Sequence, residues 1–225
     1  LMKNLEPYEI YDQVAEIYKD AEILRSKPLS NIVYMGMGEP LLNFKNVLQS
    51  THNISEDKGL GMSPKRITIS TAGIAKMIQK LGDEQVRFNL ALSLHAANDE
   101  KRDKIMPINE TNTLEVLAEA LKHFYSKTGT RVTYEYIIFK NFNDTLQDAQ
   151  ELVEFCQHIP CKVNIIEYNA IDDGEFEQAD PKKVDAFAAY LEDHHVIVNI
   201  RRSRGKDIDA ACGQLANKNK AALKD

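Results

Sequence analysis

The sequence has few cysteines, no long apolar run and no excess of basic residues. Its 225 residues include only three cysteines, an odd number that argues against a disulfide framework and indicates a reducing compartment. No apolar run approaches the length of a membrane span, and no signal-like apolar stretch opens the chain. We therefore expect a cytoplasmic protein with no membrane partner.

The charge balance is acidic. With a formal net charge of −6, the chain is expected to have no general affinity for nucleic acid. Any contact with RNA phosphates would use a local basic strip, and residues 201–206 (Arg-Arg-Ser-Arg-Gly-Lys) are the candidate. The alternative for this strip is a solvated surface.

Strand and helix patterns alternate along the chain. The length of 225 residues fits one large domain or two small ones, and 43% hydrophobic and 28% charged residues are typical of an ordinary soluble protein. The patterns predict strands at 31–35, 66–70, 86–94, 131–139, 162–168 and 196–200, with helices before and between them. Residues 98–109 are expected to be irregular and polar. Such alternation indicates a parallel sheet with right-handed crossovers, and five β/α repeats plus a final strand fit a barrel or an open part of one.

Local signals place the helix starts and their inward faces. The first helix is expected to turn Ile10, Val14, Ile17, Ala21 and Leu24 to one side. Predicted starts are Asn43 and Thr113 as N-caps, Asp144 with Gln147 as a capping box, and Asp180 followed by Pro181.

The segment Gly36-Met-Gly-Glu-Pro40 follows the first predicted strand directly, and that strand is expected to be buried. Two glycines let a ligand approach the main chain. Glu39 precedes Pro40, which keeps it out of the helical region. A carboxylate there suits an ammonium group and not a pyrophosphate. Because Leu41 stands where a third glycine would be needed, the segment argues against a dinucleotide site.

Polar residues recur where the predicted strands end. In order along the chain they are Gly38 with Glu39, Ser70 with Thr71, Ser93 with His95, Glu135, and Asn169. Ligands of barrels and open α/β sheets bind at the carboxyl ends of the strands. We therefore expect a small, polar ligand with several hydroxyl groups at this edge.

Five segments carry a family resemblance, in order and over nearly the whole chain. They are Gly36-Met-Gly-Glu-Pro40, Ser70-Thr-Ala-Gly73, Ser93-Leu-His-Ala96, Met106-Pro-Ile-Asn109 and Asp207-Ile-Asp-Ala-Ala-Cys-Gly-Gln-Leu215. Together they resemble the radical S-adenosylmethionine RNA adenine methyltransferases, and the adenine-C2 enzymes more than the adenine-C8 enzymes. The resemblance implies a partial TIM barrel, S-adenosylmethionine, a [4Fe–4S] cluster, an electron donor protein, and ribosomal and transfer RNA as partners.

The resemblance also implies roles for particular residues. Gly38 and Glu39 would hold the methionine end of S-adenosylmethionine, and Cys212 would be a catalytic cysteine that is itself methylated. The rest of the cofactor would be lined by Ser70, Ser93, His95 and Asn169. As a thiolate, Cys212 would accept a methyl group, and the target adenine would have to leave its helix to reach the pocket.

One departure from the family is decisive. The cluster of these enzymes is bound by a Cys-x3-Cys-x2-Cys loop, and Cys156, Cys161 and Cys212 do not have that spacing. We expect the cluster ligands to lie outside this chain, which would then be a radical S-adenosylmethionine core fragment without the first barrel strand and inactive alone. Its expected parts are barrel repeats at 1–195, a final strand with the cysteine segment at 196–215, and a polar tail at 216–225.

Other interpretations stay open at this point. The chain could belong to a C8-methylating enzyme, to a non-catalytic RNA- or nucleoside-binding protein, or to an unrelated barrel lyase that uses Glu39 or Glu135 as a base. Cys156, His158 and Cys161 could suggest zinc, but no fourth ligand is near in sequence, so we expect no metal site. A monomer is expected.

Overall fold

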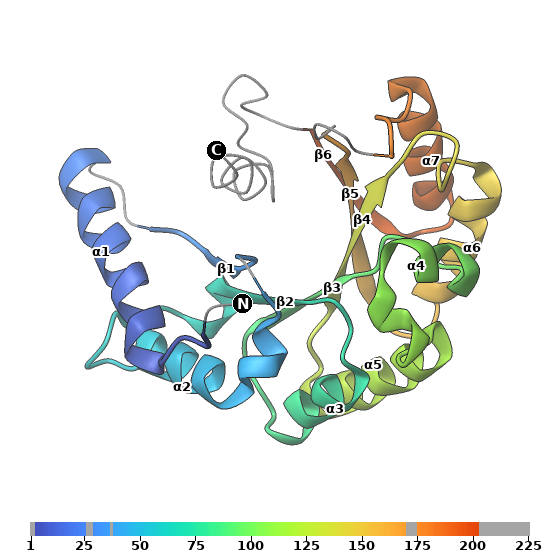
Figure 1. Cartoon of the computed structure of the whole chain (residues 1–225). Coiled ribbons are helices and arrows are strands. Elements are labelled where there is room, and N and C mark those ends of the chain that lie inside the picture. The colour runs from blue at the N-terminus through green and yellow to red at the C-terminus, as the bar shows by residue number, and fades with distance from the viewer. Residues whose placement is uncertain (1–2, 26–28, 37, 170–174, 203–225) are drawn as a thin grey trace, which may run out of the picture.

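The protein is an α/β structure built on one curved sheet. The computed structural model describes residues 3–25, 29–36, 38–169 and 175–202. Six parallel strands follow one another in chain order, β1 to β6, and the helices pack along the outer side of the curve (Figure 1). The predicted partial barrel with a parallel sheet, outer helices and a C-terminal strand is confirmed in this arrangement.

The elements alternate along the chain. The strands are β1 (Ile32–Tyr34), β2 (Ile67–Thr71), β3 (Asn89–Ser93), β4 (Val132–Ile138), β5 (Cys161–Glu167) and β6 (Ile197–Arg201). The α-helices are α1 (Pro7–Arg25), α2 (Phe44–Ser55), α3 (Ala75–Asp83), α4 (Asp99–Ile105), α5 (Leu114–Thr128), α6 (Leu146–Cys156) and α7 (Pro181–Asp193). Three short 3₁₀ helices are η1 (Pro40–Asn43), η2 (Pro64–Arg66) and η3 (Pro107–Glu110).

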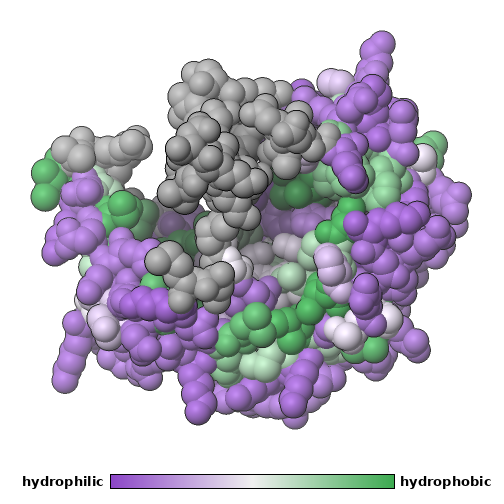
Figure 2. Space-filling view, in the orientation of Figure 1, coloured by the Kyte–Doolittle hydropathy of each residue, from purple (hydrophilic) through white to green (hydrophobic). Residues whose placement is uncertain are grey.

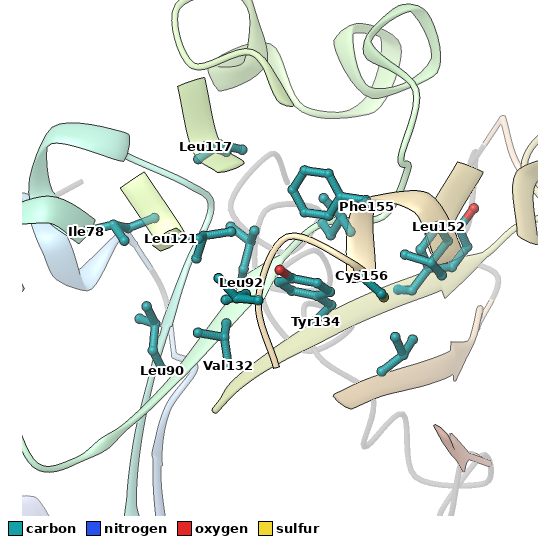
Figure 3. Close-up of a cluster of buried hydrophobic side chains, with 14 of the residues drawn as sticks. Ile78, Leu90, Leu92, Leu117, Leu121, Val132, Tyr134, Leu152, Phe155 and Cys156 are labelled. Carbon is teal, nitrogen blue, oxygen red and sulfur yellow. The ribbon is translucent and has the colours of Figure 1, made fainter. Parts of the chain in front are cut away.

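The hydrophobic core lies between the sheet and these outer helices. Successive strand residues point to opposite faces, so Leu90 and Leu92 of β3 and Tyr134 of β4 face the helices and are fully buried. Figure 3 shows this layer, in which Tyr134 lies beside Phe155 of α6, with their ring centroids 5.4 Å apart. Burial of such side chains stabilises the fold by about 1.5–3 kcal/mol each.

The alternate strand residues face the inner, concave side of the sheet and are largely polar. They include Ser70 of β2, Ser93 of β3, Glu135 of β4 and Asn164 of β5. The outer surface of the helices is mostly hydrophilic as well (Figure 2). The sheet therefore has an apolar face that holds the fold together and a polar face available to a ligand.

Two of the four predicted helix starts are confirmed by cap hydrogen bonds, and two differ in detail. Thr113 caps α5, and the carboxylate of Asp180 accepts a hydrogen bond at the start of α7. The capping box of α6 lies one residue later than predicted, at Thr145 with Asp148. Asn43 does precede α2, but its side chain makes no cap and donates to the Leu5 carbonyl oxygen instead, at 2.8 Å.

Three other predictions about local structure are wrong. The first strand was expected to be buried, but β1 lies at the edge of the sheet described here, and Val33 is 58% exposed. Ile10 and Val14 of α1 pack against the core as predicted, but Ile17 is 56% exposed, and Tyr11 and Tyr18 pack there as well. The segment 98–109 is not irregular, since it contains α4 and η3.

No helix in the described ranges is long and apolar enough to cross a membrane.

Candidate functional site

Glu39 joins the ends of the first two strands. Its backbone is extended (φ −115°, ψ 110°), as the following proline requires. One carboxylate oxygen accepts the Leu41 amide at 3.0 Å and so caps η1, and the other accepts the Ala72 amide, just after β2, at 2.7 Å. Both oxygens keep a further lone pair, so the carboxylate is fixed in place and can still accept a hydrogen bond from a ligand.

The glycines before Glu39 leave room beside it. Gly38 has φ +100°, a conformation that side-chain-bearing residues rarely adopt. A methyl group built on Gly36 would meet no atom within 4 Å. A cavity of about 420 Å³ borders Gly36, Gly38 and Glu39, and its other walls come from residues 3–5, α1, η1, Tyr34 of β1 and Val47 of α2. The two glycines therefore form a cradle with space for a ligand against the main chain.

Ser70 and Ser93 extend the site along the inner face of the sheet. Ser70 is the fourth residue of β2, and its neighbours Ile69 and Thr71 point to the helix side. Ser93 is the last residue of β3 and pairs in register with Glu135 of β4. Each serine thus places a hydroxyl near the carboxyl end of its strand, as predicted, although neither lines the cavity beside Glu39.

His95 is held rigidly in the loop after β3. Its backbone has φ +58°, and its carbonyl oxygen accepts from the amide of Asn143 at 2.7 Å. Its ring Nδ1 accepts the Ile137 amide at 3.1 Å, which leaves the proton of the neutral ring on Nε2. Burial, and then the charge of Arg102, lower the pKa of His95 to about 4. At neutral pH the ring is therefore a neutral hydrogen-bond donor.

The remaining predicted site residues have different outcomes. Asn169 lies two residues after β5 and is partly buried, at the same edge as the other strand ends. Glu135 does not end its strand, because β4 continues to Ile138; its side chain is 4% exposed and lies deeper on the inner face. Cys212 lies outside the described residues.

A polar row crosses the inner face at the level of Ser93, and sequence reasoning missed most of it. The amide of Asn164 donates to Glu135 at 2.8 Å, and the amide of Asn199 donates to Asn164 at 3.3 Å. Arg201 donates to the second oxygen of Glu135 at 3.4 Å. The alternation of polar and apolar residues in β5 and β6 was the signal available, but only the strand register shows that these residues are neighbours.

Part of the basic strip at 201–206 is engaged with acids. Besides the contact between Arg201 and Glu135, Arg202 pairs with Asp185 of α7 at 2.9 Å. Residues 203–206 lie outside the described part of the chain. Arg202 and Asp185 are both more than half exposed, so their ion pair is weak, whereas the partner of Arg201, Glu135, is buried.

No group of three or more His, Cys, Asp or Glu residues that could hold a metal occurs within the ranges described here. Cys156 and Cys161 do lie together: the Cys161 thiol is 3.8 Å from the Cys156 carbonyl oxygen. The ring of His158 packs edge-on against Phe155. A hydrogen bond with Cys161, and then burial, raise the pKa of the Cys156 thiol, which disfavours the thiolate that a metal needs. The absence of a metal site at these three residues remains a prediction from the sequence.

The site thus combines a fixed carboxylate, an open glycine cradle, two hydroxyls and a neutral imidazole along one edge of the sheet. A ligand with an ammonium group at one end and hydroxyl or ring acceptors at the other matches this set of groups.

The comparisons with known proteins agree on one family. The model of the Radical SAM superfamily matches residues 4–156. A "Probable dual-specificity RNA methyltransferase RlmN" from Christiangramia forsetii is 58% identical over 217 residues, 96% of this chain and 62% of that protein. A protein of the same name from Cytophaga hutchinsonii is 62% identical over 216 residues, 96% of this chain and 59% of that protein.

A solved structure matches the fold. The crystal structure of a radical SAM methyltransferase from Sphaerobacter thermophilus superposes with a TM-score of 0.90 at 34% identity, covering 95% of this chain and 62% of that one. The chain therefore spans about 60% of the length of each of these relatives.

Proposed function

Because the chain belongs to the radical SAM superfamily, we propose that it forms the cofactor-binding core of an RNA methyltransferase acting on C2 of adenosine in ribosomal and transfer RNA. The observation that carries the proposal is the 58–62% identity, over 96% of the chain, to proteins named as dual-specificity RNA methyltransferases. The chain covers only about 60% of those proteins, so the activity is proposed for the full-length protein.

The described residues fit S-adenosylmethionine. The cradle at Gly36 and Gly38 leaves open the space in which an amino acid could lie, and Glu39 offers lone pairs to its ammonium group. Gly38 and Glu39 are therefore proposed to bind the methionine end. The residues proposed to line the rest of the cofactor are Ser70, Ser93, His95 and Asn169.

S-adenosylmethionine, when bound, supplies a transferable methyl group. The residues of this chain bind and orient it. Glu39 is held by two backbone amides and so keeps its position without a ligand. His95 donates from Nε2, because Nδ1 already accepts the Ile137 amide. A donor fixed before binding loses little entropy when the ligand arrives.

Cys212 is proposed as the residue that accepts the methyl group. A thiolate is the competent nucleophile, so the full protein must favour its deprotonation. This assignment depends on the nine-residue segment around Cys212 in the sequence. The adenine must then leave its stack to meet the modified sulfur.

The described residues do not fit a [4Fe–4S] cluster. No suitable group of ligands occurs among them, and the three cysteines of the sequence lack the required spacing. We therefore propose that the ligands of the cluster lie outside this chain. An electron donor protein, a monomeric state and a cytoplasmic location remain predictions from the sequence.

The test uses the full-length protein purified from cells. We expect mass spectrometry to find a methylated thiol on Cys212, and nuclease digestion of the treated RNA to yield 2-methyladenosine. A Cys212→Ala variant should give neither product while still binding S-adenosylmethionine. Formation of 8-methyladenosine would favour the C8 enzyme, and an unmodified Cys212 with bound RNA but no methylation would favour the binding protein.

A further inference from the structure

One arginine is buried entirely beneath the candidate site. Arg102 of α4 has no exposed surface, and burying an arginine is costly unless its N–H groups find acceptors. All three of its nitrogen atoms donate. Nε donates to the Leu94 carbonyl at 3.1 Å, Nη2 to the Ala72 carbonyl at 2.7 Å and the Ser93 carbonyl at 3.3 Å, and Nη1 to Asn109.

The three carbonyl groups belong to the loops that carry the site. Ala72 follows β2, and its amide is the group that donates to Glu39. Ser93 ends β3, and Leu94 directly precedes His95. One guanidinium group therefore joins the loop that fixes Glu39 to Ser93 at the end of β3 and to the following loop, which carries His95.

The guanidinium group is itself held from the helix side. Its Nη1 lies 2.6 Å from the side-chain oxygen of Asn109, whose amide donates to Asp99 at 2.8 Å and to Asp103 at 2.7 Å. Burial lowers the pKa of Arg102 to about 10, and the nearby charges of Asp99 and Asp103 oppose that shift. The group is thus protonated at neutral pH, and Asn109 of the Met106-Pro-Ile-Asn109 segment anchors it.

The guanidinium group packs closely against the backbone of Gly73. A methyl group built on Gly73 would lie 3.2 Å from Nη2 and 3.1 Å from Leu117. A lysine ammonium offers three donors from one atom and cannot reach acceptors spread around a planar fork. The contacts therefore require arginine and not merely a positive charge.

We propose that Arg102 is a positioning residue that sets the spacing between the two halves of the cofactor site. It touches neither the cofactor nor the reacting atoms. It fixes the loop after β2, with Glu39 at the methionine end, relative to the loop after β3, with Ser93 and His95 at the nucleoside end. This inference rests on the proposed binding of S-adenosylmethionine.

The test compares a ligand that spans both halves with one that occupies only one. The full-length, cluster-reconstituted protein is prepared with Arg102→Lys, and with Lys104→Met as a matched control on the exposed side of α4. Dissociation constants are measured for S-adenosylmethionine and for 5′-methylthioadenosine, which lacks the amino-acid end. Thermal unfolding of each variant is measured as well, and binding is assayed at a temperature at which every variant is folded.

If Arg102 sets the distance between the loops after β2 and β3, its replacement should weaken the binding of S-adenosylmethionine, which contacts both loops, and not that of 5′-methylthioadenosine. We expect Arg102→Lys to bind S-adenosylmethionine at least tenfold more weakly and 5′-methylthioadenosine within twofold of the wild type. A general loss of structure would weaken both equally and would overturn the proposal, as would unchanged binding of both. If Arg102→Lys does not fold, Asn109→Leu, which removes the oxygen that accepts from Nη1, takes its place, again with Lys104→Met as the control. Asn109→Leu should then weaken the binding of S-adenosylmethionine and leave that of 5′-methylthioadenosine within twofold, and Lys104→Met should change neither.

The outcome distinguishes this inference from the proposed function. If the wild-type protein binds no S-adenosylmethionine, the proposed function fails. If the wild type binds it and the variants bind both ligands as well as the wild type does, only the role of Arg102 is refuted.

Discussion

The Glu39 carboxylate lies 2.7 Å from the backbone nitrogen of Ala72, thirty-three residues later in the chain. This bond closes the end of β1 onto the end of β2. The same carboxylate caps η1 through the Leu41 amide. The residue proposed to bind the methionine end of the cofactor thus also fixes the end of β1 against the end of β2.

Replacing Glu39 with Gln should weaken both binding and folding. The amide of glutamine presents only one acceptor oxygen to two backbone N–H groups, and a hydrogen bond to a charged group contributes about 1.5–3 kcal/mol. We expect the free energy of unfolding to fall by about 1–3 kcal/mol and the affinity for S-adenosylmethionine to fall at least tenfold. Urea denaturation and equilibrium dialysis measure the two. Glu56→Gln, at an exposed pair with His52, is the control and should change neither.

Stability should depend on pH through His95. Burial and the charge of Arg102 lower its folded pKa to about 4, whereas the unfolded chain takes up the proton near pH 6.5. The unfolded state therefore binds more protons between these values. The contribution of neutral His95 is complete above about pH 6.5 and is lost as the pH falls toward 4, by up to about 1.4 kcal/mol per pH unit.

The variant His95→Asn checks this dependence. Asparagine tolerates the left-handed backbone at this position (φ +58°) and does not titrate. Denaturation at several pH values from 4.5 to 7.5 should give a shallower loss of stability for the variant than for the wild type. An equal loss of stability with falling pH in the variant and in the wild type would contradict the prediction.

Asn143 should be one of the most sensitive buried polar positions. It is fully buried, donates to the carbonyls of His95 at 2.7 Å and Ile137 at 2.9 Å, and accepts the Phe139 amide at 2.7 Å. Alanine would leave these three backbone groups without partners, at a cost of about 1–3 kcal/mol for each buried group. We expect Asn143→Ala to lower the unfolding free energy by at least about 2 kcal/mol, measured by urea denaturation. Asn31→Ala, at an exposed position, should change it by less than about 0.5 kcal/mol.

Replacement by alanine should lower the thermal stability at Gly73 but not at Gly36. Gly73 has φ +108°, and its new methyl group would lie 3.1–3.2 Å from Leu117, Arg102 and Leu92, so Gly73→Ala should lower the thermal midpoint by several degrees. Gly36→Ala meets no atom within 4 Å and should leave the midpoint unchanged. If the cradle holds the cofactor, Gly36→Ala should nevertheless reduce the affinity for S-adenosylmethionine. Unchanged affinity would argue against the cradle.

Sequence patterns predicted most of the elements because they are local. The inward positions of α7, Val184, Phe187 and Leu191, are buried as their helical spacing predicted. Helix α4 escaped prediction because its sequence is almost wholly polar, Asp-Glu-Lys-Arg-Asp-Lys-Ile. It is stabilised by the Asn98 cap and by the hydrogen bonds of Arg102 to distant strand ends, which no local pattern reveals.

The sequence by itself determined the alternation of strands and helices, the glycine–carboxylate segment after β1 and the polar residues near the strand ends, because periodicity and turn chemistry depend only on near neighbours. Tertiary structure alone decided which of these residues meet. It brought Ala72 to Glu39, aligned Asn164 and Asn199 with Glu135, and buried Arg102 where three carbonyl groups converge. Those contacts join residues far apart in the chain, and they form only when the parallel strands settle into one register.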